Sequence, residues 1–135
     1  MATPSVLSKN YLEKMGWKSG KVERYVAQVQ RFFDLFGFID MVAIHKEFGF
    51  LAVQTTGGGN GSARVKKILA NASAFSWLQA GGKIEVHDWK LKKSSGKVEP
   101  KIYHITLKDF PEETKKEAEK IGWYGFGLFV FLVTA

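Results

Sequence analysis

The sequence predicts an α/β domain, and three observations support that prediction. Two apolar runs, residues 35–44 and 50–56, have the length of strands and are separated by a segment short enough for a hairpin loop. A glycine-rich turn precedes an apolar stripe of helical period over residues 63–80. Residues 83–91 and 101–110 alternate apolar and polar side chains, as half-exposed strands do.

The first half of the chain begins with a helix over about residues 5–15, whose apolar stripe includes Leu7 and Leu12 and which ends at Gly16. Residues 17–25 follow as a predicted strand. Residues 28–34 are expected to connect this strand to the two apolar runs. These runs form a central hairpin around a loop at about residues 45–49.

The second half begins with the glycine turn at residues 57–61. Ser62 is the predicted N-cap of one helix over residues 63–80, which ends at Gly81 and Gly82. A strand at 83–91, a polar loop at 92–100 and a second strand at 101–110 should follow. The predicted order is therefore a helix, three strands, a helix and a strand, followed by a further strand.

The C-terminal extension, residues 111–135, starts a helix at Pro111 that should reach about Lys120. The uncharged tail at 121–133 is shorter than the roughly 20 residues that a bilayer-spanning helix needs. We expect a buried strand or a contact between copies there, with an interfacial membrane contact as the alternative. With a core over about residues 5–110, the whole chain forms one domain.

The composition favours a polyanionic partner. The chain has 135 residues, with 20 Lys and Arg against 13 Asp and Glu, which gives a formal net charge of +7. Thirteen of the 20 basic residues follow Gly61, although lysines along strand edges also serve to block aggregation. The absence of cysteine excludes disulfides, thiolate zinc sites and cysteine nucleophiles. Without a recognisable secretion signal, a cytoplasmic location is expected.

A carboxylate inside an apolar run needs a partner, because its burial costs several kcal/mol otherwise. Asp40 lies in the first apolar run, and Gln54, Thr55 and Thr56 end the second one. Strand alternation places Gln54 and Thr56 on one face and Thr55 on the other. Carboxylate, amide and carbonyl oxygens suit a hard cation such as Mg²⁺, which would activate a water for phosphodiester hydrolysis.

Other catalytic motifs are absent from the sequence. The glycine turn matches neither a phosphate-binding loop nor a dinucleotide-binding loop, although its backbone amides beside Arg64 could hold a DNA phosphate. The histidines lie on separate segments without metal-ligand spacing, so surface or strand-edge roles are expected for His45, His87 and His104. No serine hydrolase elbow occurs.

Four blocks of sequence resemble the PD-(D/E)XK nuclease superfamily, in particular its small, often phage-encoded members similar to Holliday-junction resolvases. They span residues 34–40, 53–56, 63–68 and 77–86, followed by Trp89. The resemblance covers about residues 5–110 and implies a restriction-endonuclease-like core of a helix, three strands, a helix and a strand. It also implies a bacterial or phage-infected cell and a homodimer.

The resemblance assigns roles to individual residues. Asp40 matches the metal-binding acid, Gln54 stands where a Glu is usual, Thr55 offers a carbonyl to the metal, and Thr56 stands where a lysine is usual. Gln54 brings no charge and Thr56 no ammonium group, which weakens the match. Basic residues of the next helix are candidates to replace the lysine, namely Arg64, Lys66 and Lys67.

An additional carboxylate often comes from the first helix in this superfamily. Glu23, on the first predicted strand, is the preferred candidate here, with Glu13 and Asp34 as alternatives. Each also has a structural explanation: Glu23 as an exposed charge on a strand, Glu13 as a surface residue of a helix, and Asp34 as a turn former.

The leading hypothesis is a Mg²⁺- or Mn²⁺-dependent DNA endonuclease, selective for branched or distorted DNA. Asp40, Gln54, Thr56 and Glu23 would be catalytic, and Arg64, Lys66, Lys67 and Lys90 would contact phosphates. Two alternatives stay open: a DNA-binding module that has lost the chemistry, and an assembly protein that uses the apolar tail.

Overall fold

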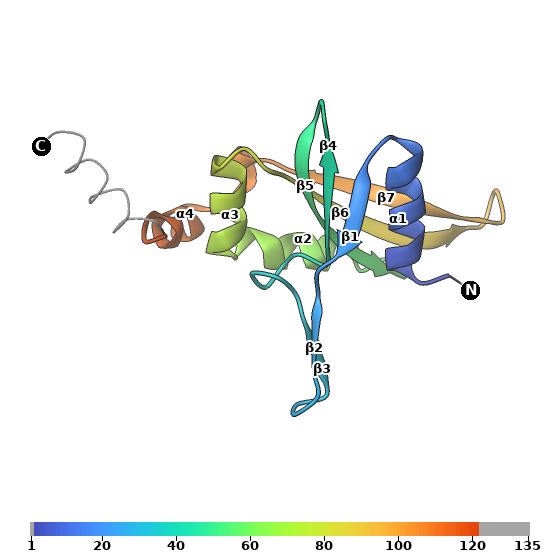
Figure 1. Cartoon of the computed structure of the whole chain (residues 1–135), viewed down its shortest axis with the longest axis horizontal. Helices are drawn as coiled ribbons and strands as arrows, with labels where there is room; N and C mark the ends of the chain where they lie inside the picture. The colour runs from blue at the N-terminus through green and yellow to red at the C-terminus, as the bar shows by residue number, and fades with distance from the viewer. Residues whose placement is uncertain (1, 122–135) are drawn as a thin grey trace, which may run out of the picture.

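A computed structural model describes residues 2–121 as an α/β fold with a mixed five-stranded sheet, four helices and a separate two-stranded hairpin (Figure 1). The sheet order is β1-β4-β5-β6-β7, in which only β5 and β6 are parallel. The helices are α1 (Pro4–Lys14), α2 (Gly61–Leu69), α3 (Ala72–Gln79) and α4 (Glu112–Glu119), with a 3₁₀ turn at Leu107–Asp109. The strands are β1 (Lys18–Lys21), β2 (Arg24–Val26), β3 (Arg31–Phe33), β4 (Met41–His45), β5 (Gly49–Gly57), β6 (Lys83–Lys92) and β7 (Lys97–Ile105).

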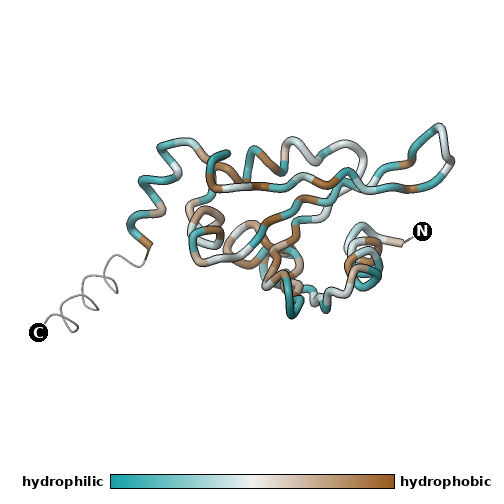
Figure 2. Tube along the Cα trace, turned by 90° about the horizontal axis from the view of Figure 1, so that it is seen from above, coloured by the Kyte–Doolittle hydropathy of each residue, from teal (hydrophilic) through white to brown (hydrophobic). Residues whose placement is uncertain are grey.

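The sheet separates two apolar clusters. On one face, Leu12 of α1 packs against Met41, Leu51 and Val53 of the central strands. On the other face, a larger cluster joins the sheet to α2, α3 and α4; its members include Phe38, Ala52, Ile68, Phe75, Ile84, Val86 and Ala118. Seen from above, α1 stands apart from the other helices across the strands (Figure 2). Strand alternation explains the division, because neighbouring residues of β5 supply opposite faces.

The predicted helix over residues 63–80 is wrong as a single element. The chain breaks at Ala70 and Asn71, and the Asn71 side chain accepts hydrogen bonds from the backbone N–H groups of Ser73 and Ala74. This is the standard role of an N-cap asparagine, so Asn71 starts α3 as a new helix. The prediction missed it because the apolar period continues across the break. The predicted Ser62 cap is also wrong, since Asn60 is at that position and makes no side-chain cap.

The predicted strand over residues 17–25 divides into two strands of different sheets. β1 pairs with β4 up to Lys21, after which the chain leaves the main sheet. β2 then pairs with β3, within the segment that was expected only to connect. The resulting β2–β3 hairpin projects away from the body of the molecule (Figure 1).

The first apolar run is a strand only from Met41 onward. Residues 35–39 form a tight turn closed by a bridge between Leu35 and Ile39. Phe36 has φ of 55° in this turn, a conformation that costs a residue with a Cβ roughly 1–2 kcal/mol. The Asn71 side chain donates a hydrogen bond to the Phe36 carbonyl at 3.0 Å and thereby holds the turn.

The remaining differences are in the C-terminal third. β7 begins at Lys97, so most of the predicted polar loop is strand. β7 ends at Ile105, before the predicted limit. The predicted contact of the apolar tail falls on residues outside the described range, except for the exposed Ile121. Within residues 2–121, no helix is long and apolar enough to cross a membrane.

Candidate metal centre

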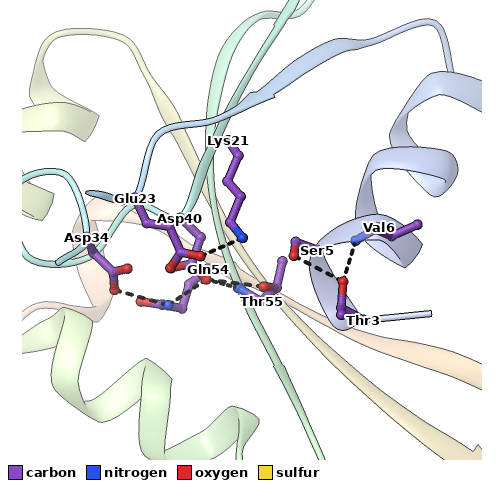
Figure 3. Close-up of polar contacts among 9 residues, drawn as sticks. All are labelled: Thr3, Ser5, Val6, Lys21, Glu23, Asp34, Asp40, Gln54 and Thr55. Atoms are coloured by element: carbon purple, nitrogen blue, oxygen red, sulfur yellow. Dashed lines mark hydrogen bonds and ion pairs between the residues drawn. The ribbon is translucent and has the colours of Figure 1, made fainter. Parts of the chain in front are cut away.

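Three carboxylates meet where the β2–β3 hairpin joins the main sheet. Glu23 directly precedes β2, Asp34 directly follows β3, and Asp40 directly precedes β4. Their nearest oxygens all lie within 4.8 Å of one another (Figure 3). The tight turn at residues 35–39 makes this possible, because it brings the chain back to β4 within a few residues of Asp34.

The Asp40 side chain is held by donors from β5. Its Oδ2 accepts hydrogen bonds from Gln54 Nε2 at 2.8 Å, from Thr55 N at 2.8 Å and from Thr55 Oγ1 at 3.2 Å. Gln54 Nε2 also lies 3.4 Å from Asp34 Oδ2 and so bridges the two acids. Among the hydrogen bonds of residues 2–121, none uses Asp40 Oδ1. Oδ2 therefore takes all the hydrogen bonds that β5 donates to this carboxyl group.

The pKa of the Asp40 carboxyl is raised from 3.8 to about 7, and burial is the largest cause. The interaction with the Asp34 side chain also raises this pKa, whereas the hydrogen bond from Thr55 N–H lowers it. The negative charges of Asp34 and Glu23 add smaller increases. The Asp40 carboxyl therefore titrates near neutral pH, where its protonated and charged forms are both populated.

Lys21 is the basic residue that reaches this cluster within the described part of the chain. Its Nζ lies 2.8 Å from Glu23 Oε1 (Figure 3). Sequence reasoning missed Lys21, although its spacing from Glu23 in an extended segment places both side chains on one side. Three carboxylates and one ammonium carry a net charge of −2 when all are ionised, which one divalent cation would balance.

The donor set fits a hard divalent cation. Carboxylate oxygens are the preferred ligands of Mg²⁺, which usually keeps several waters and needs only one or two protein carboxylates. Asp40 and Asp34 each offer an oxygen, and Glu23 offers a third at the rim of the cluster. Burial above all, and to a smaller extent the charges of Asp34 and Glu23, disfavour the charged form of Asp40, which a bound cation would favour.

Of the three candidates for the additional acid, the structure brings together two. Glu23 and Asp34 both join Asp40. Glu13 does not, because it is exposed on α1, where its Oε1 lies 3.9 Å from Lys9 Nζ.

The polar residues of β5 take different roles. Gln54 and Thr55 contact Asp40 directly, but it is the Gln54 amide nitrogen that faces the acids, so coordination through its oxygen stays a prediction. Thr56 is buried one position beyond, opposite Asp88 of β6 in the parallel register. Within residues 2–121, no side-chain hydrogen bond joins Thr56 to the cluster.

The predicted phosphate contacts lie on two elements. Lys66 and Lys67 are exposed on α2, Arg64 is half-buried there, and Lys90 is exposed on β6. The predicted phosphate site at the start of α2 stays a prediction, but two of the amides in the glycine turn already bind Asp88. Asp88 is buried, and its carboxylate accepts hydrogen bonds from Gly59 N at 3.2 Å and from Gly61 N at 3.0 Å.

A second polar cluster lies beneath α1. His87 Nδ1 is 2.9 Å from Ser8 Oγ, and His87 Nε2 is 2.8 Å from Glu85 Oε1. This order of serine, histidine and acid resembles a catalytic triad, but Ser8 and His87 are fully buried, and Ser8 Oγ also accepts a hydrogen bond from Trp89 Nε1. The cluster therefore fastens α1 to β6, and the predicted surface or strand-edge role of His87 is wrong.

The resemblance to the PD-(D/E)XK superfamily stays a prediction. Comparison of the chain with protein-family models, curated proteins and solved structures finds no match. The functional evidence is therefore the geometry of the cluster itself: three acids, one lysine and a fixed glutamine at the junction of the hairpin and the sheet.

Proposed function

We propose that this chain is a metal-dependent DNA endonuclease with a restriction-endonuclease-like core. The observation that carries the proposal is the meeting of Glu23, Asp34 and Asp40 at the edge of the central strands. The order of α1, three antiparallel strands, a helical segment and a parallel strand supports it. The net charge of +7 favours DNA as the substrate.

The three acids would hold the cation, with Asp40 in the central position. A bound divalent ion polarises a phosphodiester and generates a hydroxide nucleophile from water at neutral pH. Gln54 and Thr55 contribute by fixing Asp40 Oδ2 and thereby the orientation of its carboxyl group. Such support from neighbouring hydrogen bonds keeps a ligand in one orientation.

Lys21 would replace the missing lysine of the superfamily signature. Thr56 cannot stabilise the charge that develops on a phosphate in the transition state, whereas an ammonium group can. Lys21 already contacts Glu23 at 2.8 Å, and a cation bound to Glu23 would weaken that ion pair and make its Nζ available to a phosphate oxygen. No residue of α2 is needed for this role.

Cleavage assays test the proposal directly. Purified protein is incubated with linear, flapped and four-way DNA in Mg²⁺, Mn²⁺ or EDTA. We expect cation-dependent cleavage that Asp40→Asn lowers by roughly a hundredfold or more, while the matched control Glu13→Gln, an exposed acid of α1, cleaves like the parent. An absence of cleavage on all three DNAs, or equal cleavage by Asp40→Asn, would refute the proposal.

A binding module without chemistry is the second candidate, because Gln54 directs a donor, rather than a ligand oxygen, at the acids. It requires DNA affinity that is indifferent to Mg²⁺ and to Asp40→Asn. Titration calorimetry with MgCl₂ separates the two functions. A Mg²⁺ site that Asp40→Asn abolishes would count against the binding module.

A further inference from the structure

The β2–β3 hairpin presents aromatic rings that the fold does not use. Tyr25 and Phe32 are 52% and 61% exposed and lie opposite each other in the register, with ring centroids 5.0 Å apart. The hairpin projects from the sheet and contributes nothing to either apolar cluster (Figure 1). Exposed rings that form a pair on a projecting element indicate a contact surface.

Between its acidic base at Glu23 and Asp34, the hairpin carries only positive charge. Residues 24–33 contain Arg24 and Arg31 and no acid. The Arg31 guanidinium lies 5.5 Å from the Phe33 ring centre, and Lys21 Nζ lies 5.8 Å from the Phe32 ring centre. A polyanion fits such a surface, whereas a second copy of the hairpin would bring like charges together.

The aromatic face leads to the acidic cluster. In an antiparallel pair, opposite residues share a face and the face alternates along the strands. Tyr25 and Phe32 share one face, and the same alternation returns to that face at Glu23 and Asp34, next to the ends of the two strands. A ligand that lies along this face therefore reaches the candidate metal centre.

We propose that the hairpin is an arm that binds unpaired nucleotides of DNA. Bases would stack on Phe32 and Tyr25, because every base has a flat face that can bury these rings. Arg24 and Arg31 lie on the other face of a ribbon only two strands wide, from which their long side chains reach the phosphates. This inference rests on the proposed function and names its substrate class as DNA with an unpaired segment next to a duplex.

The test is a binding experiment in EDTA, where the proposed cleavage cannot occur. Forked DNA with 2-aminopurine in the unpaired arm and the matching duplex are titrated with parent protein, Phe32→Ala, Phe32→Trp and Phe48→Ala. Phe48 is a matched control, since it is also 51% exposed but lies in the β4–β5 turn. Thermal unfolding of every variant checks that the fold is retained.

We expect the parent to prefer the fork and to quench 2-aminopurine. Phe32→Ala should lose roughly ten- to a hundredfold of fork affinity and most of the quenching, whereas Phe32→Trp and Phe48→Ala keep both. Arg24→Gln and Arg31→Gln should each lower the slope of log affinity against log salt by about 0.7. The proposed arm would be wrong if Phe32→Ala kept the parent affinity for the fork, or if it lost the same affinity for the fork and for the duplex.

Two further outcomes separate this inference from the proposed function. If Phe32→Ala abolishes concentration-dependent self-association of the protein without changing DNA binding, the hairpin contacts another copy and the arm is wrong. If fork binding depends on Phe32 but no DNA is cleaved in Mg²⁺, the arm stands and the endonuclease is wrong. If the protein cleaves DNA in Mg²⁺ but its fork binding does not depend on Phe32, the endonuclease stands and the arm is wrong.

Discussion

Asp40 is held in two opposing ways. The hydrogen bonds from Gln54 and Thr55 favour its charged form, while burial and the neighbouring acids favour its neutral form. The effects that favour the neutral form are the larger ones, since the net result is a pKa raised to about 7. In the proposed metal centre, such a residue would exchange its proton for a cation in the neutral pH range.

The metal-free protein should therefore lose stability as the pH rises. A carboxyl whose pKa is 3.8 in the unfolded chain and about 7 in the folded one stabilises the folded protein fully below about pH 4. This contribution to the free energy of unfolding is lost as the pH rises to about 7. The difference is on the order of 4 kcal/mol. Urea unfolding in EDTA at pH 5 and pH 8 measures the part that is lost over that range, which is about 3 kcal/mol.

Asp40→Asn provides the comparison, because it has no proton to lose. Its free energy of unfolding should change less between pH 5 and pH 8 than that of the parent, and it should be the more stable protein at pH 8. Parallel changes in the two proteins would mean that Asp40 titrates normally. At pH 8, saturating Mg²⁺ should raise the free energy of unfolding of the parent but not that of Asp40→Asn.

Lys21 should affect the rate of cleavage rather than metal binding. Lys21→Met removes an ammonium group next to Glu23, so we expect kcat to fall by roughly a hundredfold while Mg²⁺ affinity stays equal or increases. Lys18→Met, an exposed lysine on the same strand, should keep the parent rate. Single-turnover cleavage and calorimetry measure the two quantities. Weaker Mg²⁺ binding in Lys21→Met would identify a structural role instead.

At the scale of elements, the start of α2 is held by a side chain of β6, Asp88. The Asp88 carboxylate binds the amides of Gly59 and Gly61, and its negative charge lies at the positive end of the helix. Gly61 is needed at this point, because a Cβ there would overlap the Tyr103 ring and the Asp88 side chain. The direction of α2, and of its exposed lysines, depends on this contact.

Asp88→Ala should therefore destabilise the protein by roughly 2 to 4 kcal/mol, since two backbone amides lose their partner. Asn60→Ala removes an exposed hydrogen bond to the Gly57 carbonyl in the same turn and should cost less than about 1 kcal/mol. Denaturant unfolding at pH 7 compares the two. Equal losses would show that Asp88 does not anchor the helix.

At the scale of the whole molecule, the order of the main elements could be predicted because apolar periods report burial. The first helix, the central hairpin and the strand after Gly82 are all present. The helix break at Asn71 could not be predicted in this way, since a cap depends on two backbone amides and not on periodicity. The β2–β3 hairpin was missed because its exposed aromatic residues do not alternate with polar ones.

Part of the candidate site could also be predicted from the apolar pattern of the sequence. Asp40 was identifiable because a charge in an apolar run is anomalous, and Gln54 followed from the hairpin register. Asp34 and Lys21 carry no such anomaly in the sequence. They join the site through the tight turn and the bend after β1, which are tertiary features.

The position of Glu23 and Asp34 at the base of the hairpin has a thermodynamic consequence. In the proposed endonuclease, DNA that restrains the hairpin would also restrain Glu23 and Asp34, so DNA binding and cation binding would share part of their entropy cost. Linkage then requires reciprocity: the factor by which DNA strengthens Mg²⁺ binding equals the factor by which Mg²⁺ strengthens DNA binding. The proposed endonuclease would thus reach its complete active site only when nucleic acid and cation are both bound.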